Sequence, residues 1–180
     1  MNIIFLDIDN VLNYGFKTND RTEEQTYGFA PELLANLKYI LDSVQNTKIV
    51  ISSSWRMTRI MEHISKDVNW RNILEQRLGC TTVGGIIIGD IPHNFEYPGR
   101  KYWARKRGDD IKSWLNMNAW QGIDSFVILD DNISCGNIPE VFPKNFVNVD
   151  ELKINECLSK RNSDRAIKIL KTEKFKTPFT

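Results

Sequence analysis

The sequence predicts an α/β protein in which a central parallel sheet is flanked by helices. The first observation is a set of short apolar runs, rich in β-branched residues, which are typical of strands buried on both faces. These runs are residues 3–6, 48–51, 126–129 and 146–149, and a further short run at residues 86–88 is expected as strand and loop material inserted beside the sheet. The second observation is that stretches with apolar residues at helical spacing separate several of the runs, and strands that alternate with helices pair in parallel.

The helices are predicted from apolar spacing or from a residue that suits a helix start. Pro31 favours the first turn of a helix after the first strand. Asp109 or Asp110 suits the N-terminus of a later helix, and Asp150 could cap a helix after the last strand. The predicted helices are residues 31–41, 57–78 and 109–115, with one after Asp150 and one that includes residues 167–170.

The length of 180 residues predicts one domain. We expect a core at residues 1–158 with a small glycine-rich and proline-rich insertion at about 79–105, followed by a basic C-terminal helix or tail at residues 159–180. The composition, with 41% hydrophobic and 26% charged residues, is ordinary for a globular protein. The net charge of +1 by itself indicates neither a nucleic-acid nor a membrane partner.

The cysteines and the hydropathy pattern predict a cytoplasmic protein with no membrane partner. Cys80, Cys135 and Cys157 are odd in number and widely spaced, which fits neither a zinc site nor a disulfide framework and indicates a reducing compartment. No apolar stretch approaches the roughly 18 residues that a membrane span needs, and Asp7 interrupts the first one at once.

Carboxylates follow two of the predicted strands at the point where each strand ends. Asp7 and Asp9 follow the first strand, and Asp130 and Asp131 follow the strand at residues 126–129. The carboxyl ends of parallel strands meet at one edge of the sheet, where open α/β sheets bind their ligands. Carboxylates that gather there repel one another unless a cation or a shared proton intervenes, and the arrangement favours a hard cation such as Mg²⁺. Alternatively, Asp7 and Asp9 only end a strand and begin a turn.

Polar and basic residues stand near the same edge. Ser52 and Ser53 follow the second strand and could donate hydrogen bonds to an oxyanion, although a serine there could equally cap a helix. Further along, a basic stretch interleaved with aromatic residues could bind a phosphodiester backbone and stack on bases, or could simply be a solvated face. This stretch is residues 100–107, with Arg100, Lys101, Arg105, Lys106 and Arg107 as its basic members and Tyr102 and Trp103 as its aromatic ones.

In this order, the residues resemble the four motifs of the haloacid dehalogenase superfamily. Those motifs are Asp-x-Asp-x-Val, a strand-ending Ser or Thr, a Lys or Arg before a helix, and Asp-Asp. They stand here as Asp7-Ile8-Asp9-Asn10-Val11, Ser52, Lys106-Arg107-Gly108 and Asp130-Asp131. The runs Ser52-Ser53-Ser54-Trp55-Arg56 and Ile111-Lys112-Ser113-Trp114-Leu115 further resemble the branch associated with RNA-repair proteins. Asn10 stands where many members of the superfamily carry glycine.

The resemblance implies a Rossmann-like core with only small cap insertions, and a Mg²⁺-dependent phosphatase. Asp7 would attack the phosphorus of a monoester to give an aspartyl-phosphate, with Asp9 as general acid and then general base. Mg²⁺ would be held by Asp7, the backbone carbonyl of Asp9 and Asp130, with Asp131 in support. Ser52 and one cation would hold the phosphoryl oxygens, with Ser53, Arg56 and Arg105 also near the substrate. We favour Arg107 or Lys106 for that cation, and Arg105 remains open.

Other functions are compatible with these residues. A metal-dependent nuclease could use the same carboxylates, and the chain could be a non-catalytic module that binds phosphate or nucleic acid. A receiver domain is disfavoured, because its acidic pair precedes its phospho-accepting aspartate along the chain. The expected partner is a phosphorylated substrate, either a nucleic-acid end or a small molecule such as a nucleotide. Residues 79–105 could form a modest lid, and the oligomeric state is open.

Overall fold

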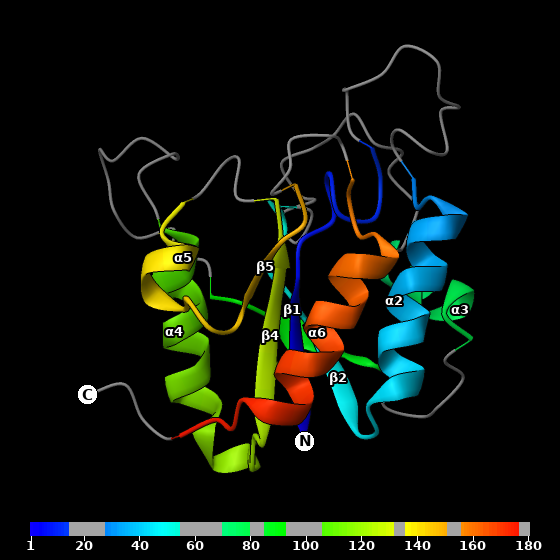
Figure 1. Cartoon of the computed structure of the whole chain (residues 1–180). Helices are drawn as coiled ribbons and strands as arrows, with labels where there is room; N and C mark the ends of the chain where they lie inside the picture. The colour runs from blue at the N-terminus through cyan, green and yellow to red at the C-terminus, as the bar shows by residue number, and fades with distance from the viewer. Residues whose placement is uncertain are drawn as a thin grey trace, which may run out of the picture.

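A single parallel sheet organises the chain, as the computed structural model in Figure 1 shows. The structure describes residues 1–14, 28–54, 70–79, 85–92, 106–131, 136–150 and 156–176. The strands are β1 (Asn2–Leu6), β2 (Thr47–Ile51), β3 (Ile87–Asp90), β4 (Ser125–Asp130) and β5 (Phe146–Asn148). The helices are α2 (Pro31–Ser43), α3 (Trp70–Arg77), α4 (Arg107–Asn118), α5 (Ile138–Val141) and α6 (Lys160–Thr172), with a short 3-10 turn at Ala119–Gln121.

The order of the strands places the end of β1 at the centre of the sheet edge. The order is β3-β2-β1-β4-β5, and every neighbouring pair is parallel. The chain runs outward from β1 through β2 to β3 and then returns to the other side of β1 with β4. The connections therefore change direction between β1 and β4, and open α/β sheets bind their ligands at such a point.

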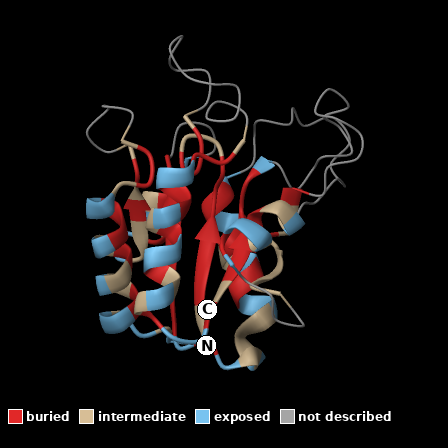
Figure 2. Ribbon diagram, turned by 90° about the vertical axis from the view of Figure 1, so that its right-hand side faces the viewer, coloured by how far each residue is buried: buried red, intermediate tan, exposed pale blue. Residues whose placement is uncertain are grey.

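Both faces of the sheet are buried, which is why its strands are recognisable as continuous apolar runs. Ile4 and Leu6 of β1 pack into an apolar cluster with α2, α3 and α6, whereas Ile3 and Phe5 pack into a second cluster with α4 and α5. Figure 1 shows these two groups of helices on opposite sides of the sheet. Figure 2 shows buried strands between helices whose outer faces are exposed. The predicted α/β class is therefore confirmed.

The observed elements differ from the predicted ones mainly at their ends. The short apolar run at residues 86–88 was expected beside the sheet, but its last two residues begin β3, which pairs with β2 as an edge strand of the sheet itself. α4 begins at Arg107, so that Asp109 and Asp110 lie in its first turn. Residues 57–69 and residues 151–155, just after Asp150, lie outside the described residues. The next described helix is α6, whose N-cap is Ser159.

α6 is packed into the core. Ala166 and Leu170 are buried in the cluster that α2 and α3 share. Just before the helix, the backbone N–H of Leu158 donates to the carbonyl of Val11 at 3.1 Å, which ties this segment to the loop after β1. None of the described helices is long and apolar enough to cross a lipid bilayer.

Candidate active site

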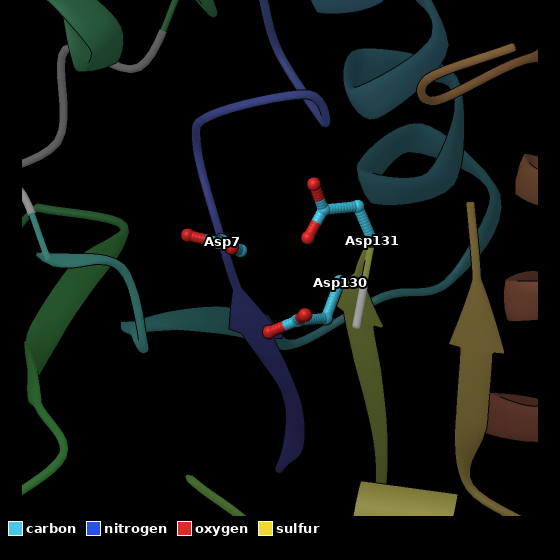
Figure 3. A group of neighbouring side chains, drawn as sticks. All are labelled: Asp7, Asp130 and Asp131. Atoms are coloured by element: carbon cyan, nitrogen blue, oxygen red, sulfur yellow. The ribbon is translucent and has the colours of Figure 1, made fainter. Parts of the chain in front are cut away.

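Three buried carboxylates gather where β1 and β4 end (Figure 3). Asp7 directly follows β1, Asp130 is the last residue of β4, and Asp131 comes next. The strands are in register with Leu6 opposite Leu129, so these ends lie at the same level of the sheet. Each of the three residues offers one oxygen, and these oxygens all lie within 4.8 Å of one another. The exposed fractions are 4% for Asp7, 2% for Asp130 and 6% for Asp131.

Arg107, the first residue of α4, neutralises part of the negative charge of these carboxylates. Its Nη1 atom donates to Oδ2 of Asp7 at 2.7 Å and to Oδ2 of Asp130, and the residue is 5% exposed. Lys106, one residue earlier, is exposed, and Arg105 lies outside the described residues. Of the two favoured cations, Arg107 is therefore the one that contacts the carboxylates.

The first turn of α4 holds Arg107 in place by packing tightly against Asn137. The backbone N–H of Gly108 donates to Oδ1 of Asn137 at 2.9 Å, and Nδ2 of Asn137 donates to Asp109 at 3.1 Å. A Cβ atom at Gly108 would lie only 2.6 Å from Oδ1 of Asn137 and 3.0 Å from its carbonyl oxygen. The glycine is thus needed for this close approach of backbone to side chain.

The loop after β1 gives Asp7 and Asp9 different surroundings. Oδ1 of Asp7 accepts a hydrogen bond from the backbone N–H of Ile8 at 2.9 Å, so both carboxylate oxygens of Asp7 have donors. Asp9 is only partly buried, and its carboxylate accepts from Nδ2 of Asn13 at 3.1 Å. The group of three carboxylates does not include Asp9. Asp9 therefore offers an accessible acid beside a buried nucleophile candidate.

Two asparagines of this loop were not predicted as site residues. Asn13 is fully buried and also accepts from the backbone N–H of Asn10 at 3.0 Å. Asn10 has a left-handed backbone, with φ of 57°, and its Nδ2 atom donates to Asp131 at 2.7 Å. The signal in the sequence was the polar residue directly after Asp9, because asparagine and glycine are the residues that adopt this backbone most easily.

The serines predicted at the second strand end lie at the same edge of the sheet. Ile51 is the partner of Leu6, and the backbone N–H of Ser52 donates to the carbonyl of Leu6 at 2.9 Å. Ser52 thus stands beside Asp7 on the neighbouring strand. Ser52 and Ser53 are fully buried. Arg56 lies outside the described residues.

The donor set of the cluster fits a hard divalent cation. Carboxylate oxygens are the ligands that Mg²⁺ prefers in proteins. In their ionised forms the three carboxylates carry three negative charges, and Arg107 carries one positive charge, so a divalent cation would balance the remainder. Among the residues that the structure describes, this is the group of acidic side chains close enough together to hold such an ion.

Comparison with known proteins places the whole of this site within one family. A family model described as the HAD domain in Swiss Army Knife RNA repair proteins matches residues 3–156, which include every one of the cluster residues. No curated protein and no solved structure matches the chain. The match spans most of the chain and agrees with the five-stranded parallel sheet. The chain therefore belongs to the family of HAD domains found in Swiss Army Knife RNA repair proteins.

Proposed function

We propose that this protein is a Mg²⁺-dependent phosphomonoester hydrolase that acts through an aspartyl-phosphate intermediate. The observation that carries the proposal is the buried carboxylate cluster at the ends of β1 and β4, with Arg107 in contact with Asp7. A nucleophilic carboxylate beside a fixed cation is suited to attack a phosphate monoester, whose negative charge must be neutralised before an anion can approach it.

In the first step, an oxygen of Asp7 attacks phosphorus and the ester oxygen leaves. Asp9 gives its proton to that oxygen, so that the product is an alcohol, and the phosphoryl group remains bound to Asp7. In the second step, Asp9 takes a proton from a water molecule that attacks the phosphorus. Inorganic phosphate leaves and Asp7 is regenerated as a carboxylate. The partial burial of Asp9 suits this exchange of protons with substrate and water.

Several residues would stabilise the phosphoryl group during both steps. Arg107 already donates to Asp7, and Ser52 lies on the neighbouring strand, so both are near the point of attack. The carboxylates of Asp7, Asp130 and Asp131, with the backbone carbonyl of Asp9, would hold Mg²⁺. When bound, the ion neutralises charge between the nucleophile and the phosphate.

The substrate proposed is a phosphorylated nucleic-acid end or a small phosphorylated molecule such as a nucleotide. The basic and aromatic residues at 100–107 support the first choice, although only Lys106 and Arg107 of them lie among the described residues. A metal-dependent nuclease is the alternative, but it would have no need for a cation placed against Asp7. We also propose a cytoplasmic location, which the odd number and wide spacing of the three cysteines in the sequence support.

The test is release of inorganic phosphate from an aryl phosphate by the wild type and by Asp7→Asn, each with Mg²⁺ and with a chelator. We expect metal-dependent turnover in the wild type and none in Asp7→Asn, because an amide cannot act as the nucleophile. Asp42→Asn is the matched control, since Asp42 is exposed and pairs with Lys38 one helical turn away. It should retain full activity.

Two results would contradict the proposal. Turnover by Asp7→Asn at the wild-type rate would remove Asp7 as the nucleophile. Cleavage of an internal diester in an oligonucleotide, without release of phosphate from any monoester, would favour the nuclease. If turnover is found, 3′- and 5′-phosphorylated oligonucleotides compared with mononucleotides would separate the two substrate classes.

A further inference from the structure

Asn10 has a backbone that glycine would adopt at lower cost. Its φ of 57° lies in the left-handed region, where glycine is unstrained and asparagine is tolerated. The backbone alone therefore gives no reason for a side chain at this position. The contacts of its side-chain amide explain why an asparagine stands here.

The amide of Asn10 joins the loop after β1 to the acidic residues after β4. Its Nδ2 atom donates to Oδ2 of Asp131 at 2.7 Å. A carboxylate can only accept, so the orientation of the amide is fixed with its nitrogen toward Asp131. The backbone N–H of Asn10 is held in turn by Oδ1 of Asn13 at 3.0 Å. Asp131 is thereby kept from rotating away from Asp7 and Asp130.

The other end of the same amide is an acceptor without a donor. Oδ1 of Asn10 is buried and has no hydrogen-bond partner within the described part of the chain. Buried polar atoms in folded proteins nearly always have a partner, and an unpaired acceptor is costly. Oδ1 is part of the same side-chain amide whose Nδ2 atom contacts Asp131, one of the three carboxylates of the cluster. Mg²⁺ usually keeps several of its water molecules when a protein binds it, and those molecules are hydrogen-bond donors.

We propose that Asn10 is a positioning residue that sets the affinity of the carboxylate cluster for a hydrated divalent cation. Nδ2 fixes the Asp131 carboxylate toward the cluster, and Oδ1 accepts a hydrogen bond from a water molecule that the cation retains. Glycine at this position would keep the loop and lose both contacts. The inference rests on the proposed function, because it requires that the cluster binds a cation.

The experiment measures binding of Mn²⁺ to the metal-free protein by titration, with free Mn²⁺ followed by electron paramagnetic resonance and no substrate present. The variants are Asn10→Gly and Asn46→Gly. Asn46 is the matched control, because it also has a left-handed backbone, with φ of 53°, but is exposed in the turn between α2 and β2. We expect the dissociation constant to rise about 10- to 100-fold in Asn10→Gly, as is typical when an outer-shell partner is removed, and to stay unchanged in Asn46→Gly.

Unfolding of the metal-free variants in urea separates this role from a structural one. Asn10→Gly eases a left-handed backbone as Asn46→Gly does, but it also loses the hydrogen bond to Asp131, so its midpoint without metal should lie at or below that of Asn46→Gly. If Asn10→Gly is less stable without metal yet binds Mn²⁺ like the wild type, Asn10 is only structural and the inference is overturned. If the wild type itself binds no Mn²⁺, the metal site of the proposed function fails and this inference fails with it.

Discussion

Arg107 determines how the three carboxylates can be buried together. Asp7, Asp130 and Asp131 are each less than a tenth exposed, and ionised carboxylates removed from water must be paired or hydrogen-bonded. Arg107 donates to two of them from a position that is itself buried. A side chain placed in this way contributes to folding in the absence of metal, besides any role toward a phosphate.

Removal of this cation should make folding depend on metal. In Arg107→Met the cluster keeps its carboxylates and loses its positive charge, so the metal-free protein should lose about 3–5 kcal/mol of unfolding free energy. The more negative cluster should also bind Mg²⁺ more tightly, and binding to the folded state stabilises it. In urea unfolding, the gain in midpoint on adding Mg²⁺ should therefore be larger in Arg107→Met than in the wild type.

Arg107→Lys is the control, since it keeps the positive charge but replaces the rigid, planar guanidinium with a flexible ammonium group. Its metal-free stability should lie between those of the wild type and Arg107→Met. Equal stability of all three proteins without metal would show that the carboxylates are not ionised together, and the electrostatic argument would be wrong.

The sequence could predict the carboxylates because each of them ends an apolar run. It could not choose between Lys106 and Arg107, because the choice depends on where α4 begins. That point is fixed by the contact of Gly108 with Asn137, which is 29 residues further along the chain. The contact between Asn10 and Asp131 spans 121 residues and depends on one backbone angle, so no local pattern could indicate it.

Among the elements, the first turn of α4 is the part on which the geometry of the site depends most. It carries Arg107 into the cluster while Gly108 packs against Asn137. The strands were predicted because their burial on both faces makes them apolar throughout. The helix α5 was not predicted, because its four residues, Ile138–Val141, are too few to show a helical period.

Gly108→Ala should disturb this turn. The new Cβ would overlap Oδ1 and approach the carbonyl of Asn137, so Asn137 must move and its hydrogen bond to Gly108 must weaken. We expect a loss of about 1–3 kcal/mol in unfolding free energy, which is more than the helix propensity gained by replacing glycine. Turnover of the aryl phosphate should fall as well, because Arg107 is the preceding residue.

Gly89→Ala is the control, because it replaces a glycine at a position where a Cβ atom causes no overlap. A Cβ at Gly89 would meet nothing within 4 Å, and this residue of β3 has no left-handed backbone. Its unfolding midpoint and turnover should both stay near those of the wild type. If Gly108→Ala behaves in the same way as Gly89→Ala, the contact with Asn137 does not hold Arg107.

At the scale of the whole molecule, the chain after residue 158 reaches both apolar clusters. Ala166 and Leu170 of α6 are buried against α2 and the sheet. Beyond the helix, Phe175 donates its backbone N–H to Asp124 at 2.8 Å and packs its ring 5.8 Å from that of Phe126 on the other face. The composition of residues 159–180 predicts a basic helix or tail, and the few apolar residues among its charges do not indicate how much of the core they cover.

The segment before α6 also reaches the site. Nδ2 of Asn162 donates to the carbonyls of Val149 and Cys157, and the thiol of Cys157 lies 3.4 Å from the carbonyl of Asn13. Asn13 in turn donates to Asp9. The C-terminal helix is thus linked through buried polar contacts to the loop that carries the acid candidate.

A chain that ends at residue 158 should therefore lose its cooperative unfolding in urea, together with the phosphate release that the proposed function predicts. Each apolar side chain that it uncovers removes about 1.5–3 kcal/mol, against a total stability of about 5–15 kcal/mol for an ordinary domain. The control is the full chain with Lys168→Gln and Lys171→Gln, which changes only the exposed side of α6 and should shift stability by less than about 0.5 kcal/mol. A shortened chain that unfolds cooperatively at the wild-type midpoint would show that α6 is an appendage, since the helix could then contribute nothing to the core.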